Sequence, residues 1–88
     1  MKVLFHKSFS KAYKKLPPKL KSKTDIAIAK FRANPFDATL NNHQLTGKLK
    51  GQRVFSVTGN FRVIFEEYDD YVVVLMLDVG THPQVYGV

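Results

Sequence analysis

Three segments in the second half of this chain are rich in β-branched and aromatic residues, and only three residues separate each from the next. The segments are residues 52–57, 61–67 and 71–79, and the separators are Thr58-Gly59-Asn60 and Tyr68-Asp69-Asp70. Connections this short force neighbouring strands to run antiparallel. Residues 72–77 are apolar at every position, which predicts a central strand covered on both faces. The pattern therefore predicts a three-strand antiparallel meander.

The first half of the chain predicts one strand and two helices. Residues 3–5 form a short apolar strand, and Ser8 offers a hydroxyl cap to a helix that Pro17-Pro18 ends. A second helix is expected from Pro18 to about Ala33, and residues 35–50 are expected to be a loop. The expected fold class is α+β in the order β-α-α-β-β-β. Two N-terminal helices pack on a small sheet dominated by the meander, in a single domain over residues 1–88.

The positive charge of the chain is concentrated in its first part. Residues 1–53 carry thirteen Lys and Arg against two Asp, whereas residues 54–88 carry one Arg against five carboxylates, so the net charges are +11 and −4. This asymmetry indicates a polyanionic partner, nucleic acid first and an acidic protein second. The chain has no cysteine and no apolar run long enough for a secretory signal or a membrane span. We therefore expect a cytoplasmic protein without membrane contact.

Cations and imidazoles lie along the expected sheet and its approaches. They are His43, Lys48, Lys50, Arg53, Arg62 and His82, with Tyr86 close behind. Arg62 lies in an otherwise apolar strand, where a guanidinium needs an anionic partner or an open groove. A structural salt bridge to Glu66, Glu67 or Asp78 is the competing account. Arg53 is expected to line the same concave face as Arg62.

This set of side chains fits the cleavage of RNA. RNA carries its own nucleophile, the 2′-hydroxyl, so cleavage needs a base, an acid and cations for the phosphorane charge, but no metal. His43 and His82 can transfer protons near neutral pH. No phosphate-loop motif is present, and the three histidines show no metal-ligand spacing, so we expect neither metal nor cofactor and interpret His6 as structural. The Arg62 strand and residues 80–86 are predicted to form one side of a basic RNA-handling cleft.

Three segments of the chain resemble a known superfamily. Residues 45–53 (LTGKLKGQR), 59–65 (GNFRVIF) and 78–86 (DVGTHPQVY) resemble the RelE/ParE superfamily of bacterial toxins, and most of all its YafQ and RelE messenger-RNA interferases. The resemblance implies a RelE-like fold and the toxin of a type II toxin-antitoxin system, an endoribonuclease that cuts messenger RNA in the ribosomal A site. It also implies three partners: a cognate acidic antitoxin, the ribosome with its messenger, and operator DNA reached only through the antitoxin.

The resemblance also implies roles for individual residues. Positions that match the active site of YafQ-like toxins are His43, His82 and Tyr86, and positions that match RelE-like toxins are Arg53, Arg62 and Tyr86. The expected catalytic residues are therefore His82, His43, Arg62 and Tyr86. The expected RNA and phosphate-binding residues are Arg53, Lys48 and Lys50.

Two departures from the YafQ pattern leave other functions open. Ser56 and Asn60 stand where YafQ-like toxins have a histidine and an acidic residue. One alternative is a ParE-like inhibitor of DNA gyrase without nuclease activity, although such proteins generally lack the C-terminal His and Tyr present in residues 81–86. The other is a catalytically inert relative that still binds an antitoxin.

Overall fold

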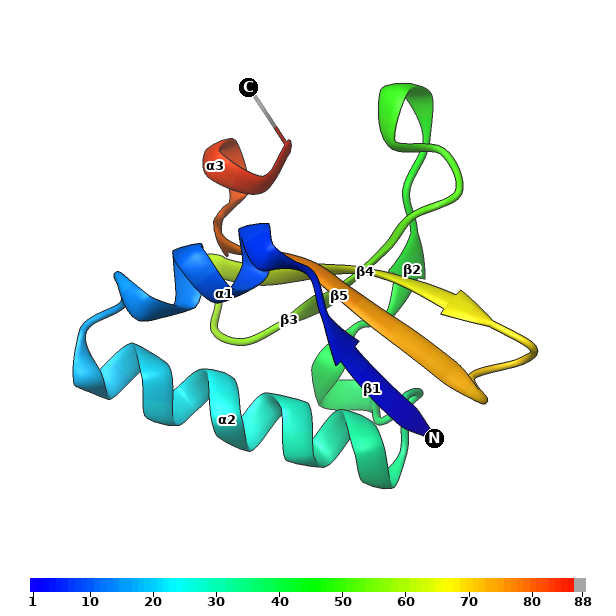
Figure 1. The fold of residues 1–88 in the computed structure, drawn as a ribbon, viewed down its shortest axis with the longest axis horizontal. Helices are drawn as coiled ribbons and strands as arrows, with labels where there is room; N and C mark the ends of the chain where they lie inside the picture. The colour runs from blue at the N-terminus through cyan, green and yellow to red at the C-terminus, as the bar shows by residue number, and fades with distance from the viewer. Residues whose placement is uncertain (87–88) are drawn as a thin grey trace.

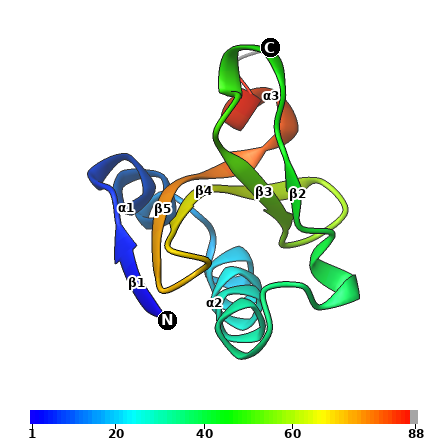
Figure 2. The same ribbon diagram turned by 90° about the vertical axis from the view of Figure 1, so that its right-hand side faces the viewer.

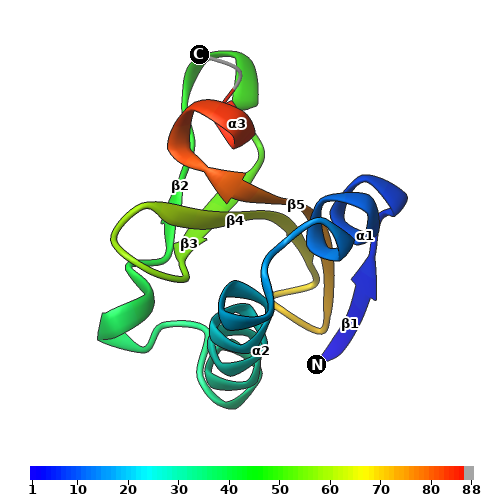
Figure 3. The ribbon, with the colours of Figure 1, turned by 90° about the vertical axis from the view of Figure 1, so that its left-hand side faces the viewer.

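The protein is a five-stranded mixed sheet with helices on both faces (Figure 1). The computed structural model describes residues 1–86, apart from the side chains of residues 84 and 86. The elements are β1 (Lys2–Phe5), α1 (Lys7–Lys14), α2 (Pro18–Ala33), β2 (His43–Gln44), β3 (Arg53–Ser56), β4 (Phe61–Tyr68), β5 (Val73–Thr81) and α3 (His82–Tyr86). The strand order is β1-β5-β4-β3-β2, and only β1 pairs in parallel, with β5. Figure 2 and Figure 3 show α2 and α3 on opposite sides of the sheet.

The expected α+β class and the antiparallel meander are confirmed. The expectation of a loop over residues 35–50 is wrong at His43–Gln44, which pairs with β3 as an added edge strand. Both residues of β2 are polar and exposed, so no hydrophobic alternation marks them. Short 3₁₀ turns at Ala38–Leu40 and Gly47–Leu49 flank this strand.

The start of α1 differs from the expectation. His6, not Ser8, is the N-cap, because its Nδ1 accepts a hydrogen bond of 3.1 Å from the Ser8 N–H. The Ser8 hydroxyl instead donates to the Leu77 carbonyl at 2.8 Å and ties α1 to β5. His6 therefore has the structural role expected for it. The second helix has the expected bounds, with Pro18 in its first turn, where a missing N–H costs nothing.

The main core lies between the sheet and the two N-terminal helices. Phe31 of α2 is fully buried at its centre, stacked on Phe55 at 4.8 Å and edge-on to Phe65 at 4.9 Å between ring centroids. Val74 and Met76 of β5 are fully buried in the same core. Each buried apolar side chain contributes about 1.5–3 kcal/mol to folding. Because this core covers the sheet face beneath α1 and α2, the opposite face is the one that α3 contacts.

A second, smaller core lies on the other face of the sheet. Val85 of α3 packs there against Val54 and Ile64, with Leu45 and Leu77 at its margin. Coverage of β5 on both faces is therefore confirmed only where α3 lies over the sheet, and its other outward positions are half-exposed. The small core holds α3 against β3 and β4.

The turn between β4 and β5 is longer than expected. Asp69, Asp70 and Tyr71 all have left-handed φ angles, of 56°, 56° and 70°, and β5 begins at Val73. A tyrosine rarely adopts this conformation. Its ring packs against Phe31 and its hydroxyl accepts a hydrogen bond from Asn42 at 3.1 Å. These contacts hold the turn, although the run of aromatic and β-branched residues predicted that the strand would begin at Tyr71.

Candidate functional site

One face of the sheet gathers several of the expected site residues. His43 lies directly opposite Val54, and Val54 directly opposite Ile64. Residues opposite one another in an antiparallel pair share a face, as do alternate residues of one strand, so Arg62 shares this face with Ile64. We call it the α3 face: the sheet face that carries His43, Val54, Arg62 and Ile64 and on which α3 packs through Val85. Strand spacing separates the Cα atoms of His43 and Arg62 by about 12 Å.

Arg62 is half-buried and held by the backbone. Its Nη1 donates to the Thr58 carbonyl at 2.8 Å and to the Phe61 carbonyl at 3.2 Å. Within residues 1–86 it forms no ion pair or hydrogen bond with the three carboxylates named as competing partners, so the salt-bridge account is wrong. Both observed bonds use Nη1, which leaves the N–H groups of Nη2 and Nε for an anion. The cross-strand neighbours of Arg62 are Ser56 and Gly80.

His43 is exposed, and its tautomer is set by a neighbouring carbonyl. Its Nδ1 lies 2.8 Å from the Asn41 carbonyl oxygen. A carbonyl only accepts hydrogen bonds, so Nδ1 carries the proton of the neutral ring and Nε2 keeps a free lone pair. His43 is thus prepared to act as a base through Nε2.

Asn42, which the sequence analysis missed, fixes the segment that leads to His43. Its side-chain amide donates to the Pro35 carbonyl at 3.0 Å and to the Tyr71 hydroxyl at 3.1 Å. Its side-chain oxygen accepts from Arg53 Nε at 3.0 Å. No sequence motif marks this asparagine, because its partners lie in three separate segments.

Arg53 lies on the opposite face of the sheet from Arg62. It is directly opposite Phe65, which is buried in the core beneath the N-terminal helices. It also lines a small hollow with Gln44 and Glu67. The expectation that Arg53 and Arg62 line one concave face is therefore wrong. Arg53 is next to Val54 in β3, and because adjacent residues of a strand point to opposite faces, Arg53 points away from α3.

The C-terminal site residues follow directly from the pairing of β5. Gly80 is opposite Arg62, and His82 begins α3 two residues later with an exposed side chain. The side chain of Tyr86 lies outside the described part of the chain, although its backbone ends α3. The structure thus brings the start of α3 close to the Arg62 end of β4.

Lys48 and Lys50 lie in the loop between β2 and β3 and are exposed. Figure 1 shows this loop extending on the same side of the sheet as α3. Leu45, at its base, packs in the small core with Val85. The two lysines therefore flank the α3 face.

Among the residues that the structure describes, no group of three or more His, Cys, Asp or Glu is placed to hold a metal ion. No helix in the same part of the chain is long and apolar enough to cross a membrane.

Comparison with known proteins decides the family. The family described as "Bacterial toxin of type II toxin-antitoxin system, YafQ" matches residues 1–87. The chain belongs to the YafQ family. It is therefore a YafQ-family toxin of a type II toxin-antitoxin system, as the resemblance predicted. A comparison with curated protein sequences gives no match.

Solved structures show the same fold. YafQ from E. coli strain BL21(DE3) is 21% identical with a TM-score of 0.81, and the match covers 97% of each chain. The E. coli DinJ-YafQ toxin-antitoxin complex is 21% identical with a TM-score of 0.78, over 97% of this chain and 96% of that one. A YoeB/ParE toxin from Agrobacterium tumefaciens is 16% identical with a TM-score of 0.76, over 93% and 99%. The fold of this YafQ-family toxin is thus RelE/YafQ-like.

The two departures from the expected YafQ pattern fall in or beside the candidate site. Ser56 lies directly opposite Arg62 on the α3 face. Asn60 precedes β4, with its backbone N–H bonded to the Thr58 hydroxyl at 3.3 Å. Both positions at which the sequence departs from the expected YafQ pattern therefore lie at the Arg62 end of β4.

Proposed function

We propose that this YafQ-family toxin is a ribosome-dependent endoribonuclease that cleaves messenger RNA in the A site. The observation that carries the proposal is the α3 face, on which His43 and Arg62 share one side of the sheet beside the helix that begins with His82. Two imidazoles and a guanidinium supply the base, acid and charge stabilisation that cleavage by the 2′-hydroxyl requires.

The proposed reaction is an attack by the messenger's own 2′-hydroxyl. Nε2 of His43 takes the proton of the 2′-hydroxyl, since Nδ1 is committed to the Asn41 carbonyl. The 2′-oxygen attacks phosphorus, and the remaining N–H groups of Arg62 stabilise the charge on the phosphorane oxygens. His82 then gives a proton to the departing 5′-oxygen. The products are a 2′,3′-cyclic phosphate and a 5′-hydroxyl, and no water is consumed.

The remaining expected residues have supporting roles. Lys48 and Lys50 contact RNA phosphates beside the α3 face, and Tyr86 stacks on or orients a base. Arg53 acts as a positioning residue through its 3.0 Å bond to Asn42 rather than beside Arg62. RNA binding is then strongly salt-dependent, because lysine contacts release counterions from the phosphates.

The proposed protein partner is a cognate acidic antitoxin, which alone brings the toxin to operator DNA. The surplus of positive charge in residues 1–53 favours an acidic chain by charge complementarity. The structures of DinJ-YafQ from E. coli and of RelBE2 from Mycobacterium tuberculosis are toxin-antitoxin complexes. This protein acts in the cytoplasm, where its ribosomal target is found.

A translation reaction tests the proposal. Purified toxin is added to messenger RNA with and without ribosomes, and the new 5′ ends are mapped; a His43→Gln/His82→Gln double variant is the matched control. New ends that require both ribosomes and the wild-type histidines support the proposal. Inhibition of gyrase supercoiling without new ends would identify the ParE-like function instead. The absence of both effects would identify an inert relative.

A further inference from the structure

Tyr71 has a backbone conformation that a tyrosine rarely adopts. It ends a run of three left-handed residues between β4 and β5, with φ angles of 56°, 56° and 70° at Asp69, Asp70 and Tyr71. Glycine would adopt this conformation without steric cost, because it has no Cβ. Strained residues persist only where the surrounding structure holds them, and they cluster at functional sites. The contacts of the Tyr71 side chain therefore indicate what a tyrosine does at this position.

Three aromatic rings fix the position of the Tyr71 ring. Its centroid lies 5.2 Å from that of Phe36, 6.1 Å from that of Phe31 and 6.3 Å from that of Phe65. The hydroxyl at the end of this packed ring accepts a hydrogen bond of 3.1 Å from the side-chain amide of Asn42. The hydroxyl is therefore a fixed acceptor for Asn42.

Asn42 holds the peptide unit that carries the Asn41 carbonyl. Its side-chain amide also donates to the Pro35 carbonyl, and its side-chain oxygen accepts from Arg53. The peptide bond is planar, so the Asn41 carbonyl can turn only together with the Asn42 N–H. Asn41 itself has left-handed dihedral angles, φ 49° and ψ 47°, which asparagine tolerates better than most residues. The three side-chain bonds of Asn42 therefore hold the Asn41 carbonyl in place.

The Asn41 carbonyl selects which nitrogen of His43 carries the proton. Nδ1 of His43 lies 2.8 Å from the carbonyl oxygen, and pairing with Val54 holds the His43 backbone. In water a neutral histidine favours the proton on Nε2, and Nε2 then has no lone pair with which to accept a proton. A carbonyl held beside Nδ1 reverses this preference, because it accepts a hydrogen bond only from a protonated Nδ1. The lone pair that a general base needs is then on Nε2.

We propose that Tyr71 is a positioning residue for His43. Its hydroxyl holds Asn42, Asn42 holds the Asn41 carbonyl, and that carbonyl keeps the proton of His43 on Nδ1. The left-handed turn between β4 and β5 places the hydroxyl where Asn42 can reach it. The inference rests on the role of His43 as a base proposed above, and it names the residues that prepare His43 for that role.

Two-bond proton–nitrogen correlation spectra of the imidazoles test these contacts. At about pH 8.5, well above the ordinary pKa of histidine, His43 of the wild-type toxin should show the Nδ1–H tautomer. His6 is the internal reference for the opposite tautomer, because its Nδ1 accepts a hydrogen bond from the Ser8 N–H. Tyr71→Phe keeps the ring and removes the hydroxyl, so the His43 signals should move toward the Nε2–H pattern while those of His6 stay unchanged. A His43 that keeps the Nδ1–H tautomer in folded Tyr71→Phe overturns the inference.

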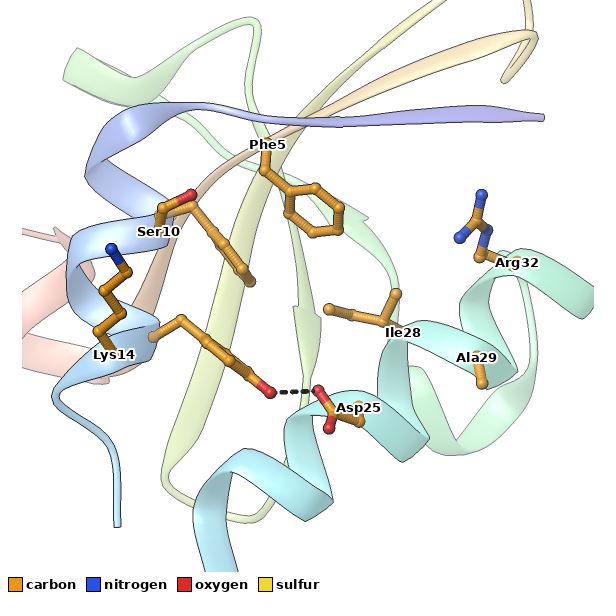
Figure 4. Close-up of a pocket in the computed structure, with 9 residues that line it drawn as sticks. Phe5, Ser10, Lys14, Asp25, Ile28, Ala29 and Arg32 are labelled. Carbon is orange, nitrogen blue, oxygen red and sulfur yellow. Dashed lines mark hydrogen bonds between the residues drawn. The ribbon is translucent and has the colours of Figure 1, made fainter. Parts of the chain in front are cut away.

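Two other tyrosines supply matched controls. The Tyr13 hydroxyl donates to Asp25 at 2.7 Å in the hollow between β1, α1 and α2 (Figure 4). The Tyr68 hydroxyl donates to Glu66, also at 2.7 Å. Tyr13→Phe and Tyr68→Phe each remove one hydroxyl hydrogen bond that does not reach the segment before His43. Both should keep the wild-type tautomer and cleavage rate, and a tautomer shift in either as large as that of the test variant overturns the inference.

Single-turnover cleavage on ribosomes tests whether these contacts serve the reaction. Tyr71→Phe should slow cleavage about three- to tenfold and Asn42→Ala at least about tenfold, with no change in the toxin concentration that gives half the maximal rate. The double variant should be no slower than Asn42→Ala, because Tyr71 acts through Asn42. Additive losses, or a shifted tautomer with an unchanged rate, overturn the positioning role. A wild-type toxin that cuts no RNA overturns the proposed function instead, and the tautomer spectra then still decide whether Tyr71 positions His43.

Discussion

Replacing Arg62 by methionine separates the catalytic role proposed for it from its structural one. The substitution removes two hydrogen bonds, from Nη1 to the Thr58 and Phe61 carbonyls. Each is worth about 0.5–1.5 kcal/mol net, so the free energy of unfolding should fall by about 1–3 kcal/mol and the Tm by about 5–15 °C. The protein stays folded, because small domains are stable by about 5–15 kcal/mol. Loss of the donors that face the phosphorane should slow cleavage about 10²–10³-fold.

The assay is single-turnover cleavage of messenger RNA on stalled ribosomes at saturating toxin, with thermal unfolding followed by circular dichroism. Arg62→Lys is the matched control, because it keeps the charge but loses the planar fork of donors. We expect it to lose about tenfold in rate, between wild type and Arg62→Met. If folded Arg62→Met cleaves within about threefold of wild type while its Tm falls as expected, Arg62 is structural and the proposed charge stabilisation is wrong.

Three further predictions concern His82, Ser56 and Asp78. His82→Ala should slow ribosome-dependent cleavage at least about tenfold while the fold survives, and a folded variant of wild-type rate would remove His82 from the mechanism. Ser56→His places an imidazole opposite Arg62 and should raise the single-turnover rate at least about threefold, whereas Ser56→Gln should not. Burial raises the pKa of the Asp78 carboxyl, against a smaller lowering by the Val79 N–H. Because a raised carboxyl pKa costs stability as pH rises through it, Asp78→Asn should stabilise the protein more at pH 7 than at pH 3 in chemical denaturation. An equal effect at both pH values would contradict this.

The fold was largely predictable because its strongest signals are local. The short turns at residues 58–60 and 68–70 fixed the antiparallel order of β3, β4 and β5, and Pro18 with Asn34 bounded α2. β2 was missed because its register depends on β3 and not on its own two polar residues. The parallel pairing of β1 with β5 is a long-range contact that no local pattern specifies.

The sequence indicated which residues could form the candidate site, but not which of them share one face of the sheet. Arg62 in an apolar strand was a clear signal, and its place on the α3 face agrees with it. The separation of Arg53 from Arg62 follows from the pairing register, which the sequence did not specify. The hydrogen bonds of Asn42 to Tyr71 and Arg53 join segments that are distant along the chain. The contact of His43 Nδ1 with the Asn41 carbonyl is local, but it depends on a backbone conformation that no sequence pattern specifies.

The most direct test of the proposed chemistry is to remove the nucleophile from the substrate. A messenger with a single 2′-deoxynucleotide immediately before the scissile phosphate is placed in the ribosomal A site and compared with the all-RNA messenger. The proposed mechanism predicts that wild-type toxin cuts the all-RNA messenger to a 2′,3′-cyclic phosphate and leaves the deoxy-substituted bond intact. Cleavage of both messengers at the same rate would contradict attack by the 2′-hydroxyl and the roles proposed for the α3 face.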